Sequence, residues 1–184
     1  VTMASQMSEA DETVSSLYSV KSEQATMLSF DTYNYLVHYF GQPQGSMSDD
    51  PNGTLGGDYE FIISSASAER IELKGKKYGN RIVMKALSED QTWKQYLTKI
   101  KKVEDDAFFY EYDLLMDGLY TGQMLRSNYT FIVTYYDEIG KVHQKTVPFM
   151  FTADGMRFHE PVTIDGQTMQ NFVWKNELIS FVCT

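Results

Sequence analysis

Alternation of apolar and polar residues is the main regular pattern along this chain. Apolar side chains occupy positions 59, 61 and 63, and Ile71–Lys74 alternates in the same way. The pair Gly79–Asn80 is typical of a tight turn, and residues 81–87 then resume a strand-like pattern. The segment from 59 to 87 is therefore predicted to be a three-strand antiparallel meander.

The residues before this meander predict further strands and one long loop. Val1–Met7 alternates weakly and fits a strand. Residues 16–40 are rich in Tyr, Val, Leu and Phe, with a polar break at 21–24, which predicts a hairpin whose second strand lies near 26–33. Residues 41–57 contain five glycines and two prolines, so they are predicted to be a long loop.

Strand signals return after Asn128. Tyr129, Phe131, Val133 and Tyr135 fall on one face of an extended segment. Further strands are predicted at 142–151, 156–158, 162–164, 171–174 and 179–182. The dipeptides Asp154–Gly155 and Asp165–Gly166 are typical of tight turns between such strands.

One helix interrupts the strands, near residues 89–102. Ser88 and Gln91 have the spacing of a capping box, which predicts that the helix begins at Ser88. Apolar residues then recur at i, i+3, i+4 and i+7, and these are Trp93, Tyr96, Leu97 and Ile100. Residues 103–118 fit a helix or a strand.

The order of these elements predicts a mainly β fold. Short turns between most strands favour an antiparallel meander or a lipocalin-like, partly closed barrel, with a two-sheet β-sandwich as the second choice. The 184 residues, 42% hydrophobic and 22% charged, are typical of a globular chain, and no change of composition divides them. Residues 1–184 are therefore predicted to form a single domain.

Charge and cysteine content narrow the classes of partner. The net charge of −9 disfavours nucleic-acid binding, which needs a basic surface to displace counterions. The lone Cys183 excludes an intrachain disulfide and a cysteine-rich zinc site, and its apolar neighbours predict that it is buried. No apolar run approaches the roughly 20 residues that span a bilayer as a helix.

Patterns for catalysis and metal binding are weak. His38, His143 and His159 do not pair at metal-ligand spacing, and no Gly-x-Ser-x-Gly or phosphate-binding glycine loop occurs. Residues 49–53 do not match a calcium loop, and the chain's many acidic residues make chance carboxylate pairs unavoidable. We expect no catalytic residue, no metal and no cofactor, and hence no enzyme; a glycan or peptide hydrolase is the enzymatic alternative.

An aromatic run before the long loop is the best candidate for ligand binding, because Tyr rings stack on sugars and other flat ligands. Ordinary core packing explains the same residues, and Asp31, Tyr33 and Asn34 fit a locally hydrogen-bonded strand end. The candidate ligand-binding residues are Tyr33, Asn34, His38, Tyr39, Lys76 and Lys77.

Three motifs carry a family resemblance: Leu28–Asn34 followed by His38, Gly56–Phe61, and Ile71–Asn80. Together they resemble an uncharacterised family of Bacteroidetes lipoproteins, catalogued as a domain of unknown function, most closely over residues 14–100. The resemblance implies export to the periplasm or outer-membrane cell surface, and a lipid anchor and further β segments upstream of Val1. This chain would then be the C-terminal part of such a lipoprotein.

The resemblance also implies a function. Genes of this family lie near outer-membrane nutrient-uptake systems, which suggests a cell-envelope binding or accessory domain that takes part in the capture of a glycan or peptide. The alternative is a structural component of an envelope protein complex that has no small-molecule ligand. The expected partners are therefore a glycan, a peptide or an envelope protein, and no nucleic acid.

Overall fold

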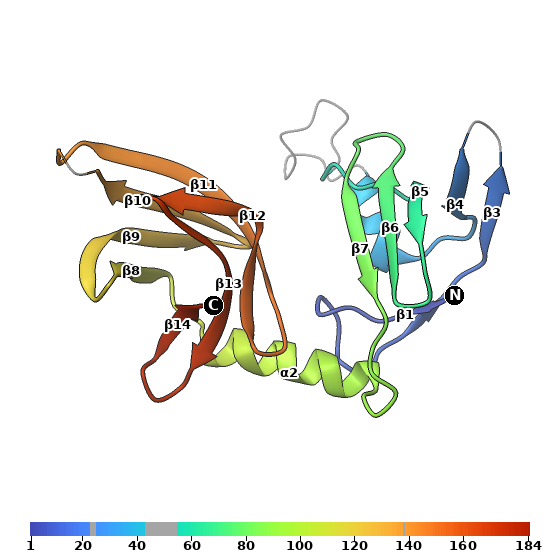
Figure 1. Ribbon diagram of the computed structural model, residues 1–184. Helices are drawn as coiled ribbons and strands as arrows, with labels where there is room; N and C mark the ends of the chain where they lie inside the picture. The colour runs from blue at the N-terminus through green and yellow to red at the C-terminus, as the bar shows by residue number, and fades with distance from the viewer. Residues whose placement is uncertain (23–24, 43–54, 138) are drawn as a thin grey trace. The chain divides into compact units, whose positions relative to one another are not determined.

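The computed structural model describes residues 1–22, 25–42, 55–137 and 139–184, which form two compact units (Figure 1). Unit 1 is Val1–Gln95 and unit 2 is Tyr96–Thr184. Antiparallel strands dominate both units, so the predicted mainly β class is confirmed. The single domain over 1–184 stays a prediction, because the division into two compact units does not show whether the units fold together.

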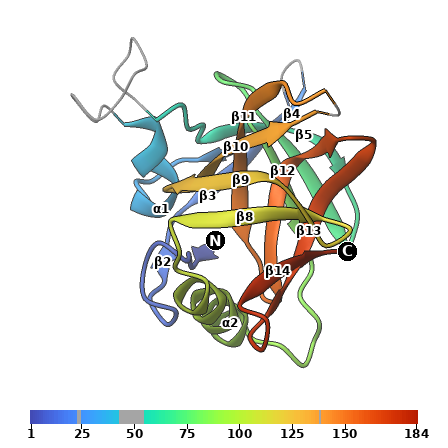
Figure 2. The same cartoon turned by 90° about the vertical axis from the view of Figure 1, so that its left-hand side faces the viewer.

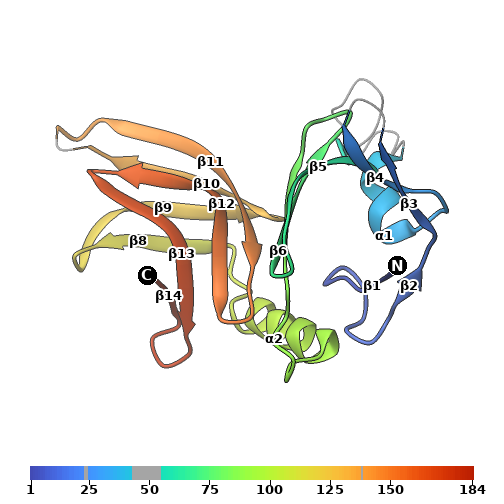
Figure 3. The ribbon, with the colours of Figure 1, turned by 45° about the vertical axis from the view of Figure 1, so that its right-hand side comes forward.

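Unit 1 contains a five-stranded antiparallel sheet whose strands follow chain order, visible on edge in Figure 3. Its strands are β3 (Tyr18–Ser22), β4 (Thr26–Phe30), β5 (Glu60–Ala66), β6 (Arg70–Gly75) and β7 (Arg81–Lys85). The predicted hairpin and the predicted meander are both confirmed. The predicted strand at Val1–Met7 is wrong in length, because only β1 (Thr2–Met3) is extended and pairs with β2 (Val14–Ser15).

A helical turn follows β4, which ends at Phe30 and so is shorter than the strand predicted near residues 26–33. The chain forms α1 (Tyr35–His38) and a 3-10 turn, η1 (Tyr39–Gly41). Aromatic and β-branched residues favour strands here, but Asn34 caps α1 by accepting the backbone N–H of Leu36 at 3.0 Å. Residues 43–54, which hold most of the predicted long loop and the 49–53 run, lie outside the described residues.

Unit 2 is a seven-stranded antiparallel meander that curls strongly into a half-barrel (Figure 2). Its strands are β8 (Glu111–Met116), β9 (Leu119–Ser127), β10 (Thr130–Tyr136), β11 (Val142–Phe151), β12 (Gly155–Ile164), β13 (Gln167–Lys175) and β14 (Ser180–Cys183). The rings of Tyr112 on β8 and Phe181 on β14 lie 5.8 Å apart, so the two edge strands approach each other. The predicted meander with partial barrel closure is confirmed.

Large apolar side chains form the core of unit 2. Phe131, Phe149 and Phe158 are at most 1% exposed, and the first two rings stack with centroids 4.3 Å apart. The helix α2 (Trp93–Asp106) adds Leu97, Ile100 and Val103, all buried. Burial of this apolar surface is the main stabilising term for the unit.

The capping box of α2 lies four residues later than predicted. Gln95 donates its backbone N–H to Thr92 Oγ1 at 3.3 Å, and Gln95 Oε1 accepts the backbone N–H of Thr92 at 2.8 Å. The carbonyl of Ser88 instead accepts the N–H of Gln91 at 3.0 Å, which closes a turn. Both quartets match the same pattern, so the sequence alone did not choose between them.

Two further predictions for unit 2 are corrected. The separate strands at 156–158 and 162–164 are one strand, β12, with a register shift between Arg157 and Val162. Cys183 is exposed, not buried, because it lies on the edge strand β14. The turn at Asp165–Gly166 is confirmed, with φ of 47° and 78°.

Candidate functional site

The carboxylate of Asp58 joins two of the sequence motifs in unit 1. Asp58 is 8% exposed and its Oδ1 accepts the backbone N–H groups of Lys77 at 2.7 Å and Tyr78 at 3.1 Å. Its Oδ2 accepts the side-chain amide of Asn80 at 3.0 Å. The segment before β5 is therefore fixed to the turn after β6.

Gly75 is required by the position of this carboxylate. A Cβ atom at residue 75 would lie 1.9 Å from Asp58 Oδ2, far inside van der Waals contact. Gly75 is the last residue of β6 and pairs with Phe61 of β5. The glycine in the Lys74–Lys77 run therefore makes room for Asp58.

The third motif is fixed by Asn34, which is completely buried. Besides capping α1, its Nδ2 donates to Ser16 Oγ at 3.3 Å. His38 Nδ1 lies 3.2 Å from the backbone nitrogen of Asn34 and 3.0 Å from its backbone oxygen. These contacts set the orientation of the His38 ring.

The His38 ring lies between two tyrosines, in a group that we call the Tyr–His–Tyr stack (Tyr33, His38 and Tyr59). His38 stacks on Tyr59 with centroids 5.0 Å apart and an interplanar angle of 17°. Tyr33 lies on it at 5.4 Å and 43°. Because Tyr33 is 60% exposed and Tyr59 46% exposed, the stack presents aromatic surface to solvent.

The remaining candidate residues are Lys76 and Lys77, which follow β6, and Tyr39, which follows His38 in the chain. Lys76 Nζ is 3.1 Å from Glu60 Oε2, and Lys77 Nζ is 4.6 Å from the centre of the Tyr78 ring. Tyr39 belongs to η1, where its ring meets Phe40 edge-on at 5.4 Å. The lysines are thus linked to the stack through residues 58–60, while ligand binding by any of them stays a prediction.

Sequence reasoning missed Tyr59. This residue connects His38, on which it stacks, to the segment of Lys76 and Lys77, to which its neighbours Asp58 and Glu60 are bonded. It was assigned only to the apolar face of a strand, yet Tyr59 directly precedes β5 and its carbonyl accepts the N–H of Phe30 at 3.2 Å. Its position in the Gly56–Phe61 motif, beside Asp58, was the available signal.

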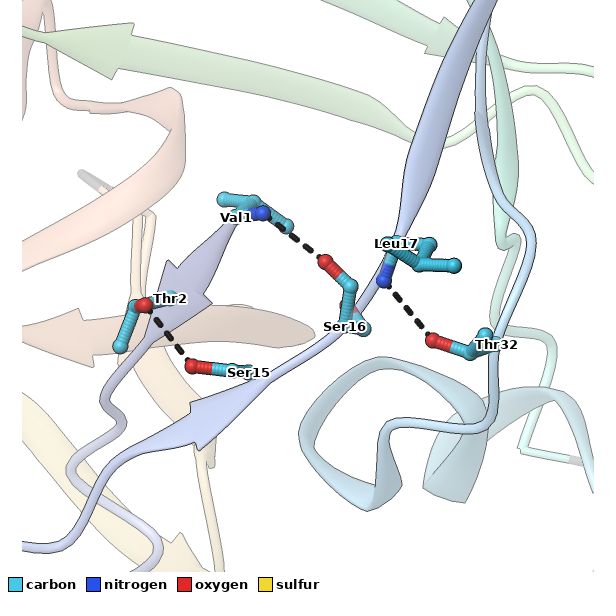
Figure 4. A pocket seen from close by; sticks show the side chains of 6 residues that line it. All are labelled: Val1, Thr2, Ser15, Ser16, Leu17 and Thr32. Carbon is cyan, nitrogen blue, oxygen red and sulfur yellow. Dashed lines mark hydrogen bonds between the residues drawn. The ribbon is translucent and has the colours of Figure 1, made fainter.

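A shallow pocket of about 290 Å³ lies in unit 1, around the β1–β2 pair. Figure 4 shows its lining residues, which are Val1, Thr2, Ser15, Ser16, Leu17 and Thr32. Several of their polar groups bond to one another: Thr2 Oγ1 and Ser15 Oγ are 2.9 Å apart, and Leu17 N–H donates to Thr32 Oγ1 at 2.8 Å. We assign no ligand to this pocket, because these internal bonds use groups that a ligand would need.

A histidine–carboxylate pair occurs in unit 2, in the hairpin between β10 and β11. His143 Nε2 is 2.9 Å from Asp137 Oδ2, and Asp137 Oδ1 accepts the N–H groups of Ile139 at 3.1 Å and Lys141 at 2.9 Å. The hydrogen bond to His143, followed by the bond from Lys141, holds the pKa of Asp137 below its usual range. This carboxylate therefore stabilises the hairpin turn.

None of the described helices is long and apolar enough to cross a membrane. Over the same parts of the chain, no three His, Cys, Asp or Glu side chains come together in a group that could hold a metal ion.

The fold and the linked motifs define a mainly β chain with a half-barrel unit and a motif-bearing sheet unit. The chain belongs to the family described as the domain of unknown function DUF4302, which matches residues 1–176. The match covers all three motifs and extends through most of unit 2. Neither the curated proteins nor the solved structures contain a match to this chain.

Proposed function

We propose that this chain is a binding domain of the bacterial cell envelope that takes part in the capture of a glycan or peptide. The observation that carries the proposal is the exposed Tyr–His–Tyr stack in unit 1. Aromatic rings offer large contact area at low cost in conformational entropy, and they stack on sugar rings and on flat peptide groups. The proposal includes no catalytic step.

Preorganisation of the stack supports a binding role. Asn34 is completely buried and contacts His38, so one ring of the stack is positioned by the protein interior. Tyr59 lies between Asp58 and Glu60, which are both bonded to the segment after β6. A surface that is ordered before binding loses less entropy when the ligand arrives.

The cell-envelope location in this proposal rests on the resemblance of the three motifs to lipoproteins. An upstream lipid anchor would hold the domain at the outer membrane, on its periplasmic or external side. The net charge of −9 favours neutral or basic ligands over polyanions. Lys76 and Lys77 would contact acidic groups at one side of the stack.

The test is an array of glycans and peptides probed with the 184-residue chain. Tyr33→Ala and Tyr59→Ala each remove one exposed ring, so each is expected to weaken binding about 2- to 10-fold. Tyr39→Ala is expected to weaken it if the ligand extends along η1. Tyr120→Ala is the matched control, since Tyr120 is 58% exposed and lies on β9 of unit 2.

A structural role in an envelope complex is the second candidate, and β7 supports it. Each residue of this edge strand is exposed, including Ile82, Val83 and Met84. An exposed apolar edge strand is a template for pairing with another chain. Two results together would favour this role over ligand capture. The chain would retain a stable protein partner in a membrane pull-down and lose it in Val83→Lys, and it would bind no glycan or peptide on the array.

A further inference from the structure

A shallow cleft of about 210 Å³ lies in unit 2, between α2 and the sheet. One face of the helix forms the first wall, with Lys99, Lys102, Val103 and Asp106. The second wall comes from the β11–β12 turn and the end of β13, with Ala153, Asp154, Trp174 and Asn176. Its volume is below the roughly 300–1,000 Å³ of pockets for drug-sized ligands, so it suits a single ring.

The indole of Trp174 is held in place in this cleft. The backbone N–H of Trp174 donates to the carbonyl of Asp154 at 2.9 Å, and the indole Nε1 donates to Asn176 Oδ1 at 2.5 Å. Phe181 contacts it with ring centroids 4.9 Å apart. The protein therefore provides an ordered aromatic wall.

Charges around the cleft cancel. Two lysines and two aspartates line it, so their formal charges are balanced, and Lys102 Nζ is 2.6 Å from Asp106 Oδ2. An anion would meet Asp106 and Asp154, and a cation would meet Lys99 and Lys102. A neutral ligand with several hydroxyl groups can donate to the carboxylates and accept from the ammonium groups without either repulsion.

We propose that this cleft binds one neutral pyranose residue, such as a terminal hexose of a glycan. The Trp174 ring contacts the apolar C–H face of the sugar, while Lys99, Asp106 and Asp154 bond to its hydroxyl groups. This site shares no residue with the Tyr–His–Tyr stack and does not depend on the function proposed for unit 1.

Fluorescence provides the first test. The chain has two tryptophans, so Trp93→Phe leaves Trp174 as the single reporter. We expect a saturable change of its emission on titration with methyl glycosides of glucose, galactose, mannose or N-acetylglucosamine, with a Kd on the order of 1 mM. Saturation-transfer NMR on the unmodified chain with the same glycosides gives a second readout if Trp93→Phe does not fold.

Variants separate this site from others. Lys99→Ala and Asp106→Asn are each expected to weaken glycoside binding at least about 3-fold. Lys145→Ala, at an exposed position on β11 outside the cleft, is expected to leave it unchanged. The proposal is overturned if no glycoside gives a saturable response in either readout, if Lys99→Ala and Asp106→Asn both leave the response unchanged, or if the zwitterion glycylglycine binds and the glycosides do not.

Discussion

At the scale of single residues, Asp58 and Gly75 explain why two distant motifs occur in one chain. The carboxylate satisfies two backbone N–H groups and one side-chain amide, and it occupies the space that any Cβ at residue 75 would need. The side chain of Asp58 therefore requires a glycine at residue 75. The spacing between them in the sequence, 17 positions, gave no sign of this contact.

Replacement of this carboxylate is expected to destabilise unit 1. Asp58→Ala leaves the N–H groups of Lys77 and Tyr78 without their acceptor, at a cost of about 2–4 kcal/mol in the free energy of unfolding. Gly75→Ala is expected to be destabilising as well, but less so when Asp58→Ala is already present, because the closest conflicts, with Asp58 Oδ2 and Cγ, are then removed. Urea unfolding of the two single variants and the double variant measures this coupling.

Asp105→Ala, at an exposed position on α2, is the control and is expected to change stability by less than about 0.5 kcal/mol. Fully additive effects of Asp58→Ala and Gly75→Ala would contradict the proposed conflict between the carboxylate and a Cβ at residue 75.

A second prediction at this scale concerns pH. His143 first, and the Lys141 N–H next, lower the pKa of Asp137 in the folded state. A carboxyl group with a depressed folded pKa contributes stability above its unfolded value of about 3.9, and this contribution is lost as pH falls through the folded pKa. His143→Ala is therefore expected to raise the carboxyl pKa of Asp137 toward that value, as measured by NMR titration.

The stability difference between the chain and its His143→Ala variant should accordingly shrink as the pH falls below the folded pKa of Asp137. His159→Ala serves as the control, because His159 is exposed on β12. An Asp137 pKa that is the same in all three proteins would show that His143 does not hold this carboxylate.

At the scale of secondary-structure elements, the beginning of α2 offers a direct comparison of two capping boxes. Thr92→Ala removes the side-chain oxygen that accepts the N–H of Gln95, and is expected to cost about 1 kcal/mol. Ser88→Ala affects the quartet that the sequence favoured and should change stability by less than about 0.5 kcal/mol. Unfolding in urea, followed by circular dichroism, distinguishes them; an equal loss in both variants would contradict the cap at Thr92.

Elements were predictable where one local pattern dominated. The strands of 59–87 alternate, and Asp165–Gly166 takes the left-handed backbone that its residues favour. α1 was missed because its Tyr and Val residues favour strands, while it begins at the cap from Asn34 to Leu36, and the side chain of Asn34 is itself held by the distant Ser16. Within the candidate site, the motif residues were found, but Tyr59 and the Asp58–Gly75 contact depend on strand pairing that periodicity does not reveal.

At the scale of the whole chain, the two units differ in the size of their cores. Among the described residues, the buried apolar side chains of unit 1 are Met27, Phe61 and Leu73, whereas unit 2 buries several phenylalanines together with methionine, valine and isoleucine side chains. Since apolar burial contributes roughly 25 cal/mol per Å², unit 2 is expected to be the more stable unit. The sequence showed no such division, because composition hardly changes along the chain.

Calorimetry of the whole chain tests this expectation. We expect two thermal transitions, with Asp58→Ala lowering the first and Phe158→Ala lowering the second. Phe158 is fully buried in unit 2, and its truncation is expected to cost about 3–5 kcal/mol. A single transition whose midpoint temperature both variants lower would instead support one cooperative domain over residues 1–184. A cooperative domain unfolds as a whole, so damage anywhere in its core lowers the same transition. If the two units unfold separately, a ligand that binds unit 1 raises the midpoint temperature of the first transition alone. The same scans with added ligand would then assign each binding site to its unit.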